Sequence, residues 1–110
     1  MGDAPIATAP GAVIPQRVRS VARHAAQALR KELGMEARIL WFSAWPRGEA
    51  RTGAPIELAI ESPSLLDTRA LSRARERVEA LDTLYSFNVV DLDQTEAARR
   101  ERMQREGMEL

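Results

Sequence analysis

The chain has 110 residues, 45% of them hydrophobic, which is enough for one small domain but not for a second independent core. Its 16 basic and 16 acidic residues cancel, which disfavours a net-basic nucleic-acid binder. Cysteine is absent, so disulfides, thiolate metal sites and a cysteine nucleophile are excluded. His24 is the single histidine, which disfavours a His-dependent catalytic triad or a metal centre of several histidines. Any metal would need oxygen ligands. No window approaches the roughly 18 consecutive apolar residues of a membrane helix.

The beginning of the chain is rich in alanine and proline and lacks the basic start and sustained apolar core of a signal peptide. We predict a flexible arm over residues 1–14 and one domain over residues 15–110. We also expect the protein to be cytoplasmic.

The first periodic segment begins at Pro15 and ends before Gly34. Proline suits the start of a helix, and glycine suits the residue that follows its end. Between them, apolar residues recur at the spacing of one helical face: Val18, Val21, Ala22, Ala25, Leu29 and Leu33. We therefore predict an amphipathic helix, with His24 exposed away from its apolar face.

Two strands are predicted next, separated by a loop. Residues 37–44 form a short apolar run without alternation, which is typical of a central strand covered on both faces. Residues 45–54 contain one proline and two glycines and are expected to form a loop. In residues 55–61 apolar side chains alternate with Glu57, Ala59 and Glu61, which predicts a strand with one face in the core.

The second half of the chain predicts helix, strand and helix in succession. Asp67 or Ser64 can cap the second helix, and residues 87–92 form the third strand. Thr95 is expected to cap a third helix that runs to Gly107.

The last three residues are long enough only for a terminal strand. A loop between the first two strands permits antiparallel pairing, and a helix between the second and third permits a crossover. We predict an α+β fold, with a mixed sheet of three to four strands and about three helices packed on it.

Residues 41–61, WFSAWPRGEARTGAPIELAIE, carry a motif. They resemble the signature of the MNT-type minimal nucleotidyltransferases of the DNA polymerase β superfamily, approximately LFGSxARGEARPxSDIDLxIE. Without gaps, the first two residues match LF, residues 47–51 match RGEAR, and the strand that follows keeps its apolar alternation. The NVVDL segment and the last helix are similar to the family's DLVDL … R … I … EG ending. The resemblance covers roughly residues 15–110 and implies a nucleotidyltransferase fold.

The same resemblance implies a site that this chain has altered. In the family, a Gly-Ser pair cradles the nucleotide triphosphate, and three carboxylates hold divalent metal. Here Ser43 and Ala44 replace the Gly-Ser pair, and Pro55, Glu57 and Asn88 stand at the three acidic positions. One carboxylate and one amide are poor support for magnesium, which requires near-octahedral oxygen coordination.

We therefore expect an inactive nucleotidyltransferase fold that holds no metal or cofactor. Magnesium and ATP are expected only if activity is retained. Glu57 is interpreted as a vestige of the site, the alternative being an edge residue paired with Arg47 or Arg51. Five residues form the degenerate phosphate loop that the resemblance implies: Ser43, Ala44, Arg47, Gly48 and Arg51.

Asp91 and Asp93 form a competing D-x-D pair. They would share a strand face if the strand reached Asp93, and with Glu57 they could rebuild a site of three acids. We favour the other reading, in which Asp93 lies in the turn before Thr95, because the ungapped alignment places Asn88 at the third acidic position.

Three functions follow. The first is binding of a protein partner, since the resemblance implies an antitoxin-like role beside a helical HEPN-type toxin. Self-association through the edge of a sheet that ends in a short strand is compatible with it. The second is a divergent enzyme that transfers a nucleoside monophosphate, using Glu57 with Asp91 or Asp93. The third is a sensor that binds a nucleotide through Arg47 and Arg51 without metal. We expect no membrane and no nucleic-acid partner.

Overall fold

The computed structural model describes residues 14–110, so all but the last residue of the predicted arm lies outside the described residues. That last residue, Ile14, is 8% exposed and packs in the main core. The folded domain therefore includes Ile14, one residue before the predicted boundary. No helix of this part of the chain is long and apolar enough to cross a membrane.

Four strands form one mixed sheet: β1 Arg38–Phe42, β2 Ile56–Glu61, β3 Phe87–Asp91 and β4 Met108–Glu109. Their order across the sheet is β3-β2-β1-β4. β1 pairs antiparallel with both β2 and β4, whereas β2 pairs parallel with β3. The predicted mixed sheet and its short terminal strand are confirmed.

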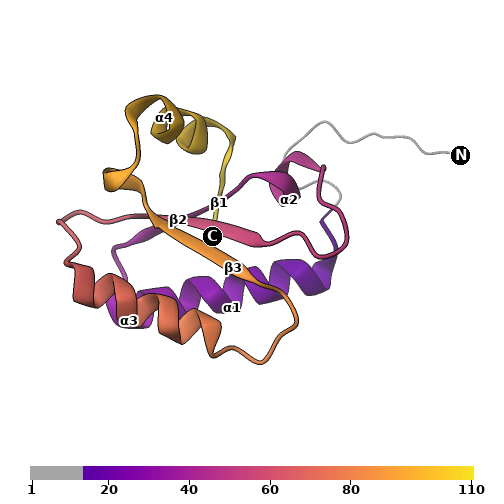
Figure 1. The fold of residues 1–110 in the computed structure, drawn as a ribbon, viewed down its shortest axis with the longest axis horizontal. Helices are drawn as coiled ribbons and strands as arrows, with labels where there is room; N and C mark the ends of the chain where they lie inside the picture. The colour runs from indigo at the N-terminus through magenta and orange to yellow at the C-terminus, as the bar shows by residue number, and fades with distance from the viewer. Residues whose placement is uncertain (1–13) are drawn as a thin grey trace, which may run out of the picture.

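Helices cover both faces of the sheet (Figure 1). α1 (Gln16–Leu33) and α3 (Thr68–Glu79) lie side by side on one face, and α4 (Ala97–Glu106) lies over part of the other. The main core forms under α1 and α3, with Leu29, Trp41 and Leu58 fully buried. A smaller cluster lies on the α4 face: Leu40, Phe42, Ala59, Leu92 and Met103. β1 is thus buried on both faces, as its unbroken apolar sequence predicts.

A one-turn helix, α2 (Ala44–Arg47), begins where a loop was predicted. Pro46 is the third helical residue, and a proline is tolerated there because the first turn has no partners for its N–H groups. Gly48 ends the helix with a left-handed φ of 73°. The α+β class is confirmed, with four α-helices in residues 14–110 rather than three.

The two later helix starts differ in how well they were predicted. Asp67 caps α3 by accepting a hydrogen bond of 2.7 Å from the Ala70 N–H. Thr95 does not cap α4, because the chain first forms a 3-10 turn, η1 (Leu92–Gln94), directly after β3. The Thr95 hydroxyl instead donates to the Asp91 carbonyl at 3.0 Å. α4 begins only after Glu96, without a side-chain cap.

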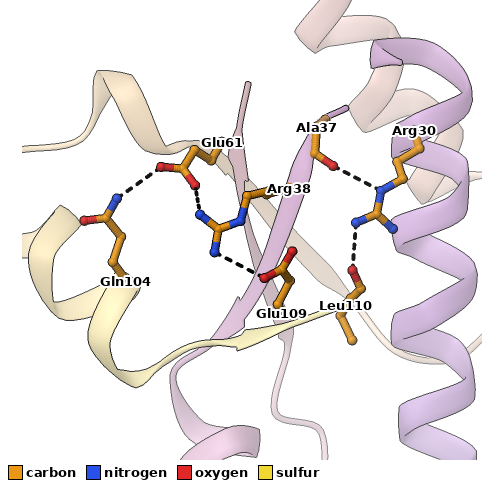
Figure 2. Close-up of polar contacts among 7 residues, drawn as sticks. All are labelled: Arg30, Ala37, Arg38, Glu61, Gln104, Glu109 and Leu110. Atoms are coloured by element: carbon orange, nitrogen blue, oxygen red, sulfur yellow. Dashed lines mark hydrogen bonds and ion pairs between the residues drawn. The ribbon is translucent and has the colours of Figure 1, made fainter. Parts of the chain in front are cut away.

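Polar contacts hold the short β4 strand in place (Figure 2). Arg38 on β1 donates to carboxylates on both neighbouring strands, Glu61 of β2 and Glu109 of β4. Glu109 first, and then Glu61, raises the pKa of Arg38 above its ordinary value. Gln104 of α4 donates to the other oxygen of Glu61 at 3.2 Å. The network thus joins three strands to α4.

A second arginine secures the chain end to α1. Arg30 donates to the carbonyls of Ala37 at 3.1 Å and of Leu110 at 2.7 Å (Figure 2). Leu110 also donates its N–H to the Ile39 carbonyl at 2.8 Å. The two-residue strand therefore has support from both β1 and α1.

α1 and α3 are bridged by one carboxylate. Glu32 of α1 accepts hydrogen bonds from Arg73 at 2.9 Å and from Arg77 at 2.6 Å, one turn apart on α3. The Arg77 and Arg73 hydrogen bonds lower the pKa of Glu32, although its partners are half exposed. The charged form of Glu32 is therefore favoured in the folded state.

We expect Glu32→Gln to make folding less sensitive to acid. Because the folded-state pKa of Glu32 is lowered, its contribution is complete above the ordinary glutamate pKa and is lost as the pH falls through the lowered value. Urea unfolding between about pH 7 and about pH 3 should show the difference between variant and wild type shrinking over that window. Glu36→Gln, at an exposed position, is the control; a pH-independent difference for Glu32→Gln would contradict the prediction.

Candidate functional site

The turn between β1 and α2 is formed by a residue in a conformation that glycine prefers. Ser43 has φ 74° and ψ −140°, and it is the one non-glycine residue with positive φ in residues 14–110. The Cβ atom makes this region costly, by about 1–3 kcal/mol for a non-glycine residue. The resemblance aligns Ser43 with the glycine of the family's Gly-Ser pair. The backbone thus forms a glycine-type turn at a position that a serine occupies.

Glu57 lies on the α4 face of the sheet, opposite the main core. It is the second residue of β2 and is paired with Phe42 on β1 and with Asn88 on β3. Alternation places Glu57 on the face opposite Ile56 and Leu58, which are fully buried in the main core. Glu57 and Asn88 are the positions that the resemblance aligns with the second and third acids. The fold therefore brings these two positions side by side on neighbouring strands.

Two adjoining hollows, of about 320 Å³ and about 190 Å³, open beside Glu57, and the larger continues around the β3 border of the sheet to α3. Glu57 and Arg99 line both of them. Asn88 lines the larger and Ser43 the smaller. We call the two hollows together the Glu57 groove. Its walls come from β1, β2, β3, α3 and α4.

The groove has more cations than anions. Its charged lining residues are Arg47, Arg75, Arg99, Arg102, Glu57, Glu79 and Glu106. Two of the arginines are engaged elsewhere: Arg75 donates twice to the Val89 carbonyl, and Arg47 pairs with Glu49 at 3.4 Å and with Glu106 at 3.8 Å. The expected alternative pairing of Glu57 with Arg47 or Arg51 is not formed.

Four charged groove residues have no ion pair or hydrogen bond with any side chain in the described part of the chain: Glu57, Glu79, Arg99 and Arg102. In the smaller hollow the uncommitted carboxylate of Glu57 lies beside the uncommitted guanidinium groups of Arg99 and Arg102, which suits an anion better than a magnesium ion. In residues 14–110 no three His, Cys, Asp or Glu side chains gather in a way that could hold a metal ion. The donor set does not fit the metal pair of the resembled family.

The structure does not bring Asp91 and Asp93 to Glu57. β3 ends at Asp91, so Asp93 lies in η1, where it is exposed. Asp91 is three residues from Asn88 and therefore leaves the strand on the opposite face. It is 5% exposed, and its carboxylate accepts the Asp93 N–H at 3.0 Å. This geometry provides no shared strand face for the D-x-D pair.

The predicted phosphate loop is divided between two surfaces. Arg47 and Ser43 line the Glu57 groove, and Ala44 begins α2. Arg51 instead lines a different cleft, next to Trp45. The indole of Trp45 anchors that loop by donating to the Ala54 carbonyl at 3.1 Å.

Sequence reasoning did not find Arg99 and Arg102. Both lie on α4, for which the sequence predicted a helix but no site residue. A signal was present in Met103, the single buried residue of α4, because it marks the side that faces the sheet. Arg99 is one turn before Met103 and shares its face.

Comparisons with known proteins give no family for this chain. No protein-family model matches it, and no curated protein matches its sequence.

We expect Ser43→Gly to stabilise the fold by about 1 kcal/mol, because it relieves the positive-φ strain while making the unfolded chain somewhat more flexible. Ser43→Ala is the matched control: it removes the same hydroxyl but keeps the strained Cβ, and should give no stabilisation. Denaturant unfolding measures both. Equal effects of the two variants would show that the hydroxyl, rather than the backbone, determines this turn.

Proposed function

We propose that this chain is a catalytically silent, nucleotidyltransferase-like domain that acts by binding a protein partner. The absence of catalysis is inferred from the pairing of Glu57 with Asn88 on neighbouring strands. The two strands meet in the register that a metal site needs, but only one of the two side chains is an acid. Asp91, the nearest replacement along β3, is turned to the other face.

Two features support the likeness on which this proposal rests. A glycine-type turn lies at Ser43, where the resembled family has glycine. The aligned acidic positions Glu57 and Asn88 are neighbours in space, although they are far apart in sequence. These features are independent, since one concerns a turn and the other a strand register.

The proposed binding of a protein partner rests on an exposed apolar region of the surface. Leu84 is fully exposed and lies with Trp45 and Tyr85 along one cleft, where an apolar side chain of a partner would cover them. The resemblance implies a helical HEPN-type protein as the partner, in an antitoxin-like pair.

A second candidate function is metal-independent binding of a nucleotide or another polyanion. The uncommitted guanidinium groups of Arg99 and Arg102 in the Glu57 groove favour it. Charge-assisted hydrogen bonds from arginine hold phosphate without magnesium.

Calorimetric titration with ATP, with and without magnesium, separates these functions. A silent partner-binding domain should bind no ATP in either condition. Binding that ignores magnesium and is lost in Arg99→Ala would favour the second candidate. Binding that requires magnesium would contradict catalytic silence.

Restoring the acids tests the likeness itself. The triple variant Pro55→Asp, Glu57→Asp, Asn88→Asp places three carboxylates on one sheet face, and we expect it to bind manganese or magnesium. Gln27→Asp with Ser72→Asp adds the same net charge at exposed helix positions and is the control. Equal cation affinity in the two variants would argue against a vestigial metal site.

Size-exclusion chromatography of the full chain, purified from the cells that make it, tests the partner. We expect a second, largely helical protein to coelute at a fixed ratio and to stay bound after repurification. Elution of the chain alone at every concentration tried would contradict the proposed function.

A further inference from the structure

A cleft separate from the Glu57 groove lies at one end of the molecule. Four segments form it: the start of α1, α2, residues 50–53 and the loop that joins α3 to β3. These segments meet at the right-hand end of the view in Figure 1. The cleft measures about 680 Å³, within the roughly 300–1,000 Å³ range of ligand sites. We call it the Trp45 cleft.

The cleft has an open apolar surface, in which two aromatic side chains contact each other. Trp45 and Tyr85 meet edge to face, with ring centroids 6.1 Å apart at 75°. The Trp45 N–H is already satisfied by Ala54, so the indole offers mainly carbon surface. Leu84 next to them has a relative exposure of 104%, the largest of any hydrophobic side chain described. Three apolar side chains thus form one exposed patch.

The charges of the cleft are of one sign. Arg17 and Arg51 line it, and no acidic residue does. Within residues 14–110 neither arginine has an ion-pair partner. A cleft with apolar walls and two unpaired guanidinium groups is complementary to an apolar group that has a carboxylate close by.

We propose that the Trp45 cleft binds a short segment of a partner protein in which an apolar side chain is flanked by Asp or Glu. The apolar side chain covers Leu84 and the Trp45–Tyr85 pair, and the carboxylates pair with Arg17 and Arg51. This inference rests on the proposed partner-binding function and specifies where that partner docks.

A second copy of the chain is a less suitable occupant. Within residues 14–110, two large exposed apolar residues precede an acid: Leu65, two residues before Asp67, whose carboxylate already caps α3, and Met35, followed by Glu36. The Met35–Glu36 pair lies near the far end of α1. α1 has 18 residues and therefore spans about 27 Å, so this pair lies at the opposite end from Arg17. Seating Met35 in the cleft of another copy would be a head-to-tail contact, which does not close into a dimer.

The test uses a phage-displayed library of random peptides of about twelve residues, selected on the immobilised full chain. We expect enriched peptides to carry an apolar residue with Asp or Glu within two positions. Leu84→Glu should lower their affinity about tenfold or more. Arg17→Glu with Arg51→Glu should change the selected flanks from acidic to basic, a switch that unfolding could not produce.

Arg23→Glu with Arg69→Glu has the same charge change at exposed helix positions and should leave the selected motif unchanged.

Enriched peptides without acids, or selection unaffected by Leu84→Glu, would overturn the proposal. So would a concentration-dependent dimer abolished by Leu84→Glu, or ATP that displaces the peptides. If the coeluting protein stays bound to Leu84→Glu, the docking site is wrong while the partner-binding function stands. If the peptides bind as expected but no protein coelutes with the chain, the docking site stands while the proposed partner-binding function is wrong.

Discussion

The double pairing of β2 is the constraint on which the other features depend. β1 lies antiparallel on one side of it and β3 parallel on the other, so its register is fixed from both sides. A slip of one residue would move Ile56, Leu58 and Ile60 from the main core to the α4 face. Each such side chain contributes about 1.5–3 kcal/mol by burial, which makes the slip prohibitive. The same register places Glu57 beside Asn88, so the position of the candidate site is a consequence of how the core is packed.

Local patterns predicted most of the fold, because they report on local physics. The alternation around Glu57 predicted β2, and the apolar run around Trp41 predicted a strand buried on both faces. The errors occurred where two local options compete. Pro46 indicated a loop, although the first turn of a helix accepts proline, and Thr95 was assigned to a helix although a 3-10 turn left its hydroxyl beside a carbonyl. The resemblance indicated Glu57 as a candidate, whereas the place of Arg99 in the groove depends on how α4 is rotated over the sheet, which sequence spacing alone does not give.

The charge of the Glu57 groove differs from that of a site built from three carboxylates. Three carboxylates near one point repel one another and are stable only with a bound cation. This chain has one carboxylate at that point, and the α4 arginines Arg99 and Arg102 lie nearby. Such a site is electrostatically tolerable when empty. A domain with this arrangement can fold without a bound ion at this point.

Arg75 has an importance that extends beyond the groove it lines. Its guanidinium donates two hydrogen bonds, of 3.0 and 2.8 Å, to the Val89 carbonyl on β3, the strand at one border of the sheet. A carbonyl occupied in this way is no longer available to a strand from another molecule. The opposite border is formed by β4, which has only two residues. Strand pairing between molecules is therefore discouraged at both borders of the sheet. The exposed apolar patch elsewhere on the surface consequently carries less risk of polymerisation.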